Sequence, residues 1–554
     1  MSDKQSKAAT AIEMANRQRE ISVSEFFLKN RHLLGFDTPA KALVTAVKEA
    51  VDNALDACEE AGLLPDIFVQ VRVHSGRSHI VVEDNGPGIV ESQIARIFGK
   101  LLYGSKFHKL SQSRGQQGMG ISAAGMYGQL TVGKPLHILS RIEGDDLASE
   151  LYVSIDTANN RPDIHRRRRV AWDRPHGTRV AMELEGHYQK GPHSIEAYLK
   201  QTAIANPHVS ITYQDPRGNQ IQFVRSTDRL PPRPVEIKPH PHGIELGRLI
   251  QMLSNTECRS LLRFLVEEFS CVGRKTALEI ISHAGKSLSD RSYPKHIAHA
   301  QATALYEAIK NTHVRAPRSD CIVPIGRERL LEGLHKELEA EFYTVAVRPA
   351  ASYRGNPFQV EVGIAYGNPF RPMIDVDPSG RMTKRQEPDA ATHLISGHDE
   401  AARLLRFANR VPLLFQQSSC AITKAILQTN WRTYGLNQPK GALPIAPMAI
   451  LVHVASVWVP YTSESKEAIQ PYPEILKEIR LGLQECARQL AHHLRRETSL
   501  RQEFARRTYI EKYLPHIGIA LQEILVLSDD ERQSAVNRLD GILHASRTSR
   551  KLES

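Results

Sequence analysis

The sequence predicts an α+β protein of several domains, with a helical insert and a long helical C-terminal region. Its 554 residues suggest about three or four domains, at roughly 150 residues each. Residues 25–228 and 307–470 mix helical and strand patterns. Between them, residues 229–243 hold five prolines in fifteen positions, which disfavours a helix and indicates a domain boundary. From about Pro471 the chain is almost purely helical.

These changes in pattern divide the chain into five regions. We expect a polar, helix-prone segment at 1–24, a mixed domain at 25–228, a boundary with a helical domain at 229–306, a second mixed domain at 307–470 and a helical region at 471–554. In the second mixed domain, the apolar runs at 411–415 and 449–459 suit buried strands.

The composition points to a folded protein with a polyanionic partner. Hydrophobic residues make up 41% of the chain, which is too rich for a disordered protein. The net charge of +11 favours polyanions, although many basic proteins bind no nucleic acid. The six cysteines are far apart and none forms a C-x-x-C, which is typical of a reducing compartment. With no apolar run long enough for a membrane helix and no secretory signal, we expect a soluble cytoplasmic protein.

The first mixed domain opens with a helix that has clear start and stop signals. Thr38 is a hydroxyl N-cap followed by Pro39, and Gly62 supplies the stop. Glu49 and Asn53 are four residues apart and share one face with Asp56. A carboxylate there can deprotonate water, and an amide oxygen suits Mg²⁺. The alternative is an ordinary amphipathic helix with a solvated polar face.

Two glycine-rich segments follow this helix. The apolar strand at 80–83 leads into Asp84, Gly86 and Gly88, where a carboxylate can accept from an exocyclic amine and the glycines allow a ligand to approach the backbone. Residues 115–120 form G-x-x-G-x-G before a helix of small residues, where backbone N–H groups can cradle phosphates. A plain turn and a flexible loop remain the alternatives. There is no Walker A string, and a Rossmann site is disfavoured because these glycines follow a polar loop.

The order of these motifs resembles that of the Bergerat-fold ATPases. Glu-x-x-x-Asn, Asp-x-Gly-x-Gly and the glycine loop are followed by a Gly-Thr pair, Gly177 and Thr178. This superfamily includes gyrase-type topoisomerases, ninety-kilodalton heat-shock chaperones, histidine kinases and mismatch-repair ATPases. Longer strings resemble topoisomerase VI B subunits, namely residues 22–37, 113–122, 406–423 and 431–444. The resemblance implies a Bergerat-fold ATPase sandwich, a helix–two-turn–helix insert, and a βαβ transducer domain that ends in a long stalk helix.

The resemblance also assigns roles to residues and implies ATP and Mg²⁺ as ligands. Glu49 would be the general base for the attacking water, and Asn53 would hold Mg²⁺. Asp84, with Gly86 and Gly88 beside it, would read the adenine amino group with support from Thr178. The phosphates would be enclosed by Ser105, Lys106, Arg114, Gly115, Gln116, Gln117, Gly118, Met119, Gly120 and Ile121.

The resemblance places a lysine from the second mixed domain on the γ-phosphate. We identify this switch lysine as Lys440, in the QPKG string. It would pair with the γ-phosphate only while that group exists, so that hydrolysis would remove a contact between two domains. From the residues alone, a lysine between proline and glycine is more often a solvated turn residue.

Several other segments allow more than one interpretation. The helical insert, including residues 272–287, either contacts the DNA backbone or is purely structural. The basic run at 165–169 is interpreted as a solvated hairpin loop rather than a DNA-binding strip. Asp375 and Asp377 form a D-x-D that we interpret as a structural turn. The His-Pro-His at 240–242 is not expected to bind metal.

The resemblance implies a B subunit that dimerises on ATP through the swapped N-terminal segment and closes a gate around double-stranded DNA. A separate A subunit would cleave the DNA, giving a heterotetramer of two A and two B chains. The terminal helices, including residues 505–525, would bind that subunit, and we expect no further immunoglobulin-like domain. The alternatives are an ATP-gated clamp or chaperone without a nuclease partner, and a histidine kinase, for which His492 and His493 are poorly placed.

Overall fold

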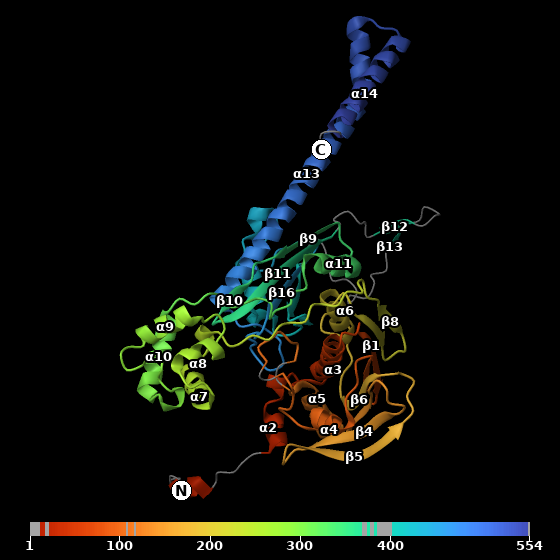
Figure 1. Cartoon of the computed structure of the whole chain (residues 1–554). Coiled ribbons are helices and arrows are strands. Elements are labelled where there is room, and N and C mark those ends of the chain that lie inside the picture. Colours follow the sequence, from red (N-terminus) through yellow and green to blue (C-terminus); the bar gives the residue numbers. More distant parts are fainter. Residues whose placement is uncertain are drawn as a thin grey trace, which may run out of the picture. The chain divides into compact units, whose positions relative to one another are not determined.

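The structure is a computed structural model that describes residues 11–16, 22–106, 109–115, 118–367, 374–376, 382–384 and 401–551. Its contacts separate two units, residues 1–432 with 436–486, and residues 433–435 with 487–554. The first unit contains two large sheets and a helical cluster (Figure 1). No helix in these described ranges is long and apolar enough to cross a membrane.

The first sheet has eight strands in the order β5-β4-β3-β6-β2-β1-β7-β8. Only β1 and β7 pair in parallel, and the other neighbours are antiparallel. The strands are β1 (Asp66–His74), β2 (Arg77–Asp84), β3 (Leu136–Arg141), β4 (Ala148–Asp156), β5 (Arg161–Val170), β6 (Gly177–Glu185), β7 (Ser210–Gln214) and β8 (Gln220–Phe223).

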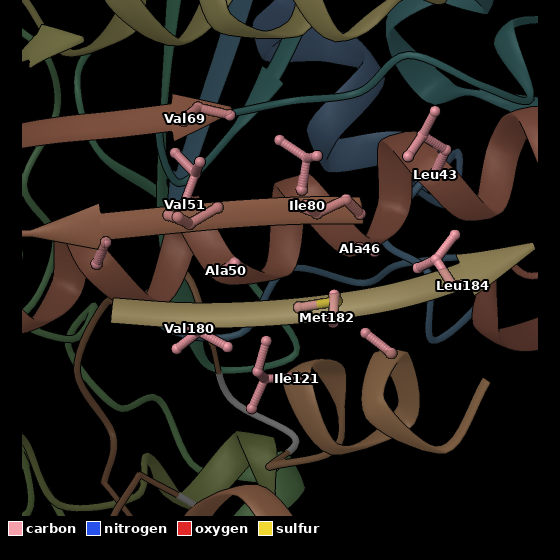
Figure 2. Packing of buried hydrophobic residues seen from close by; sticks show 14 of the residues in the cluster. Leu43, Ala46, Ala50, Val51, Val69, Ile80, Ile121, Val180, Met182 and Leu184 are labelled. Carbon is pink, nitrogen blue, oxygen red and sulfur yellow. The ribbon is translucent and has the colours of Figure 1, made fainter. Parts of the chain in front are cut away.

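Helices pack on this sheet through alternating strand residues. The short N-terminal helices are α1 (Ala11–Asn16), α2 (Val23–Lys29) and η1 (Arg31–Leu34), and the longer ones are α3 (Pro39–Ala61), α4 (Glu91–Gly99), α5 (Gly120–Val132) and α6 (Ile195–Ala205). Val69, Ile80 and Met182 lie in one buried cluster with Val51 of α3 and Ile121 of α5 (Figure 2). This packing fixes α3 and the start of α5 beside the ends of β2 and β6.

The basic run at 165–169 is part of strand β5 at the edge of the sheet, so the expectation of a hairpin loop is wrong. Three of its arginines form ion pairs: Arg167 with Glu91, Arg168 with Glu150, and Arg169 with Asp145. Paired charges along an exposed edge also protect it from pairing with another strand.

The helical insert has its own core, as the sequence predicts. It contains η2 (Pro241–Gly243), α7 (Leu246–Asn255), α8 (Leu261–Glu268), α9 (Arg274–His283), η3 (Pro294–His296) and α10 (His299–Asn311). Leu249, Phe264, Ile280 and Leu305 are fully buried in this cluster. At its start, Nε2 of His240 and of His242 hydrogen-bond to backbone carbonyl oxygens of Arg315 and Ile309, 3.0 and 3.1 Å away.

The second large sheet runs β10-β11-β16-β14-β15, with β9 also paired to β11. Its strands are β9 (Phe342–Val347), β10 (Ala351–Tyr353), β11 (Asn356–Tyr366), β14 (Arg403–Ala408), β15 (Val411–Pro412) and β16 (Met448–Ser456). The same region contains helices α11 (Arg327–Glu337) and α12 (Ala421–Gln428) and the short 3-10 helices η4 (Gln417–Ser419) and η5 (Trp431–Tyr434). The predicted strand at 449–459 is therefore present, whereas only the first two residues of 411–415 are in a strand.

A separate hairpin, β12 (Ile374–Val376) and β13 (Met382–Lys384), contains Asp375. The expectation that Asp375 lies in a turn is wrong because it pairs with Thr383 across this hairpin, and Asp377 lies outside the described residues. The C-terminal part is helical as predicted. Helix α13 (Pro473–Leu525) begins in the first unit, and the second unit holds its remainder with α14 (Asp529–Lys551).

Candidate active site

The carboxylate–amide helix forms as its sequence predicts. The Thr38 hydroxyl accepts from Lys41 N–H, and Gly62 ends α3 in the left-handed conformation at φ +77°. The apolar face of α3 is buried, and its polar face opens into a cavity of 540 Å³. Glu49, Asn53 and Asp56 all line this cavity. The helical period therefore brings the three side chains together.

Most of the other predicted residues line the same cavity. They come from the end of β2, from β6, from the loop at 104–106 and from the glycine loop with the start of α5. These are Asp84, Gly88, Ser105, Lys106, Gly115, Gly118, Met119, Gly120, Ile121 and Thr178. Gln116 and Gln117 lie outside the described residues.

Asp84 lines the cavity and is held by two backbone donors. Its Oδ1 accepts from Gly86 N–H at 2.8 Å and from Thr178 N–H at 3.1 Å. The Thr178 hydroxyl is in turn 3.0 Å from the Ser140 hydroxyl. Burial raises the pKa of Asp84 to about 6. Gly86 thus supports the carboxylate rather than lining the cavity.

Two glycines are required by close contacts around the cavity. Gly88 has φ +75°, and a Cβ there would lie 2.0 Å from the Arg141 carbonyl oxygen. A Cβ on Gly120 would lie 1.8 Å from Glu49 Oε2. The start of α5 therefore lies directly against the Glu49 carboxylate. No side chain caps this helix start, and the N–H groups of a first helical turn favour an anion.

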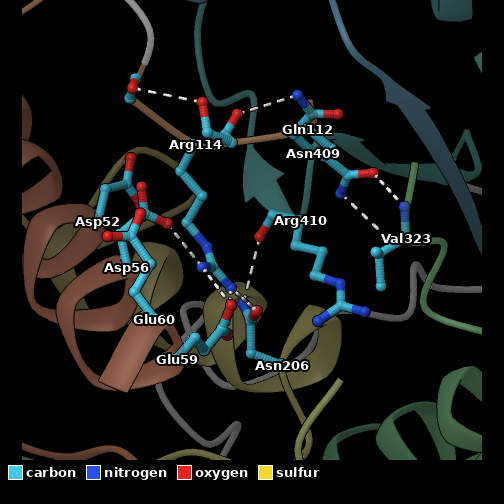
Figure 3. Close-up of polar contacts among 12 residues, drawn as sticks. Asp52, Asp56, Glu59, Glu60, Gln112, Arg114, Asn206, Val323, Asn409 and Arg410 are labelled. Atoms are coloured by element: carbon cyan, nitrogen blue, oxygen red, sulfur yellow. Dashed lines mark hydrogen bonds and ion pairs between the residues drawn. The ribbon is translucent and has the colours of Figure 1, made fainter. Parts of the chain in front are cut away.

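Lys106 and Arg114 have different environments, although both are predicted to enclose phosphates. Lys106 lines the cavity, and its Nζ is 2.7 Å from both Asp56 Oδ2 and Glu60 Oε1. Arg114 does not line the cavity and is only 5% exposed. Its side chain pairs with Asp56 at 2.9 Å and with Glu59 at 2.7 Å (Figure 3), so in this structure the guanidinium is turned to α3 and its contact with phosphate stays a prediction.

We expect Arg114 to be a major source of stability. Burial opposes its charge, yet Glu59 and Asp56 raise its pKa. Arg114→Met would leave Asp56 with only Lys106 and Glu59 with only His208, and should lower the free energy of unfolding by about 3 kcal/mol. Arg77→Met is the control, because its pair with Glu183 is exposed and is worth about 1 kcal/mol or less. Urea unfolding that shows equal losses for the two variants would contradict this assignment.

Lys440, the predicted switch lysine, is not at the cavity in this structure. It is exposed in the QPKG turn and does not line the cavity. The lysine from the second sheet region that does so is Lys466. Its Nζ lies 3.9 Å from Glu49 Oε2, and its backbone has φ +54°. A left-handed non-glycine residue at such a position is typical of a functional constraint.

The loop at 463–467 is docked onto α3 by polar contacts. Lys41 Nζ is 2.6 Å from Glu467 Oε1, and Lys48 Nζ donates to the Ser465 carbonyl oxygen at 3.2 Å. Burial lowers the pKa of Lys48, whose Nζ is 3.8 Å from Glu49 Oε1. Sequence reasoning missed Lys48, Glu464 and Lys466. The one available signal was the polar SESKE string between a buried strand and a long helix.

Comparisons with known proteins agree with this geometry. Residues 38–184 match the family described as histidine kinase-, DNA gyrase B- and HSP90-like ATPase, and residues 317–506 match topoisomerase VI B subunit, transducer. The chain is 44% identical to the B subunit of type 2 DNA topoisomerase 6 from Archaeoglobus fulgidus, covering 96% of this chain and 84% of the relative.

The corresponding B subunit from Methanococcoides burtonii is 47% identical, with 94% of this chain and 79% of the relative covered. These matches confirm that the chain contains the predicted Bergerat-fold ATPase and transducer. The chain belongs to the topoisomerase VI B subunit family, the ATP-hydrolysing subunits of type II DNA topoisomerases.

Proposed function

We propose that the cavity binds ATP with its adenine on Asp84 and its phosphates at the start of α5. The free oxygen of Asp84 would accept from the adenine amino group, since Oδ1 is occupied by Gly86 and Thr178. Lys106 also lines the cavity and would balance phosphate charge together with the helix N–H groups.

Glu49 would be the general base. It is 8% exposed, lies against the start of α5 and faces the cavity, where it can orient and deprotonate a water beside the terminal phosphate. The amide oxygen of Asn53, one helical turn away on the same cavity wall, fits Mg²⁺, which prefers oxygen ligands. Mg²⁺ held there would neutralise negative charge on the phosphate oxygens.

Lys466 takes the role of the switch lysine in this proposal. Its ammonium reaches the cavity from the transducer region while the rest of the phosphate site comes from the first mixed domain. A charge-assisted bond to the γ-phosphate would exist only before hydrolysis and release of that group. The transducer would therefore interact more strongly with bound ATP than with bound ADP, and a nucleotide switch requires such a difference between its two states.

The assembly around this subunit is also proposed. Two B chains would dimerise on ATP through residues 1–24 and close around double-stranded DNA. The helical region at 471–554 would bind a separate DNA-cleaving A subunit, which gives an intracellular complex of two A and two B chains. The observation that carries the whole proposal is the joint cavity of Glu49, Asn53, Asp84 and Lys466.

The direct test is relaxation of supercoiled plasmid by the chain with its co-purified A subunit. We expect relaxation that requires ATP and Mg²⁺, and none with either chain alone. ATP turnover that never supports relaxation with the A subunit would contradict the proposed assembly. Failure of the purified chain to bind ATP with Mg²⁺ present would contradict the proposed site.

The raised pKa of Asp84 predicts a pH dependence of ATP binding. The ionised carboxylate accepts from the adenine amino group, so protonation removes an acceptor. The affinity should therefore fall as the pH drops through about 6, approaching roughly tenfold per pH unit below that value. Asp84→Asn is the control, because it should bind weakly at every pH and lack this step. Equal pH profiles for both proteins, measured by calorimetric titration, would contradict the assignment.

A further inference from the structure

The segment that leads into the glycine loop is held by residues far away in the sequence. We call residues 112–114 the lid stem, because Gly115 follows directly. Gln112 N–H donates to the Cys321 carbonyl oxygen at 2.9 Å. Its side chain makes two more bonds to one residue: Nε2 donates to Val323 O at 3.1 Å, and Oε1 accepts from Val323 N–H at 2.6 Å. Both partners lie in the region matched to the transducer.

The second contact comes from the tight hairpin between β14 and β15. Asn409 and Arg410 form its turn, with φ +47° and +67°. Such two-residue turns favour Asn followed by Gly, so an arginine at the second position is strained. Asn409 Nδ2 donates to Ser113 O at 3.0 Å and to Ser456 O at 2.9 Å, and its Oδ1 accepts from Ser456 N–H at 2.9 Å. The hairpin is thereby fixed to the end of β16 and reaches the lid stem (Figure 3).

The third contact passes through Asn206, at the end of α6. Its Oδ1 accepts from Arg114 Nη2 at 2.5 Å, and its Nδ2 donates to the Arg410 carbonyl oxygen at 3.2 Å. One fully buried amide therefore joins the lid stem to the same hairpin. Arg114 is also held by Glu59, so this end of the stem is anchored on α3 as well.

The hairpin itself rests on a buried pair in the second sheet. Arg410 N–H donates to His453 Nε2 at 2.9 Å, and His453 Nδ1 is 2.7 Å from Glu361 Oε2. Because Nε2 accepts, Nδ1 carries the proton and donates to Glu361. Both side chains are 0% exposed. The strained turn is thus supported from beneath, as a strained conformation must be to persist.

We propose that Gln112 and Asn409 are positioning residues for ATP hydrolysis, which hold the lid stem on the transducer and so set the geometry of the phosphate-binding loop. This connection is separate from Lys466, because it acts on the loop rather than on the nucleotide. It rests on the proposed function, in which residues 115–121 surround the phosphates. Movement of the second sheet would then shift the lid stem and change the geometry of the phosphate-binding loop.

The test compares Gln112→Ala and Asn409→Gly in steady-state ATP hydrolysis. Glycine is chosen at 409 because it adopts a positive φ without strain and removes only the side chain. Gln112→Ala loses two hydrogen bonds between the stem and Val323, and Asn409→Gly loses one to the stem and two that fix its hairpin to Ser456. The KM for ATP should therefore rise about 3- to 10-fold in each variant. The kcat should change less than about twofold, because Glu49 and Lys466 are not touched.

Ser456→Ala is the matched control. Its hydroxyl bonds to Pro357 O and Trp458 O within the transducer, and Asn409 contacts only its backbone. This variant should lower the Tm and leave the KM unchanged. A wild-type KM in both stem variants would overturn the proposal, and so would a KM that rises in all three variants in proportion to lost Tm. A wild-type chain that fails to hydrolyse ATP would instead refute the proposed function.

Discussion

Replacing Glu49 with glutamine should lower the rate of ATP hydrolysis by about 10²–10⁴-fold, the usual contribution of a positioned general base. Glutamine keeps the shape of the side chain beside Gly120, where there is no spare room, but cannot take a proton from water. ATP binding should stay within a few fold of the wild type, since the adenine and phosphate contacts are made by other groups. Single-turnover hydrolysis and equilibrium binding measure the two effects separately.

Glu183→Gln is the control for this prediction. Glu183 lies on β6 of the first sheet, pairs with Arg77 and does not line the cavity. It should hydrolyse ATP at the wild-type rate. Turnover that survives in Glu49→Gln would show that another group activates the water. A loss of binding in that variant would show that Glu49 contributes to holding the nucleotide instead.

Local sequence signals predicted one wall of the cavity well. The caps of α3 and the helical period fix the relative placement of Glu49, Asn53 and Asp56, because an isolated helix already has this geometry. Asp84 follows from the same kind of reasoning, since it stands where an apolar strand ends in a glycine turn. These features depend on neighbours a few residues apart, so the sequence alone was sufficient.

The placement of Lys466 and of Arg114 depends on contacts between distant residues, and there the sequence was insufficient. Lys48 and Ser465 are 417 positions apart, and their hydrogen bond helps to hold Lys466 at the cavity. Arg114 was expected to contact phosphate because a cation beside a glycine loop is suited to that role. It is instead neutralised by Glu59, on a helix that no local pattern connects with it. The arginines of β5 likewise find their partners only once the sheet forms.

The assignment of Lys466 rather than Lys440 as the switch lysine predicts a second large effect on ATP turnover. Lys466→Ala should lower ATP turnover by about 10²–10³-fold, as expected when one donor to the developing charge is lost. Lys440→Ala should hydrolyse ATP at the wild-type rate, because Lys440 is exposed and away from the cavity. Large loss in Lys440→Ala with little in Lys466→Ala would show that Lys440 is the switch lysine after all.

A comparison of ATP with ADP separates contact with the γ-phosphate from an indirect effect on Glu49, which lies 3.9 Å from the Lys466 ammonium. If Lys466 binds the γ-phosphate, Lys466→Ala should weaken binding of a non-hydrolysable ATP analogue and leave ADP affinity unchanged. An effect exerted only through Glu49 would leave both affinities unchanged and would disappear in a Glu49→Gln background. ATP-dependent dimers of Lys466→Ala should also dissociate faster, because the bond that distinguishes the two nucleotide states would be missing.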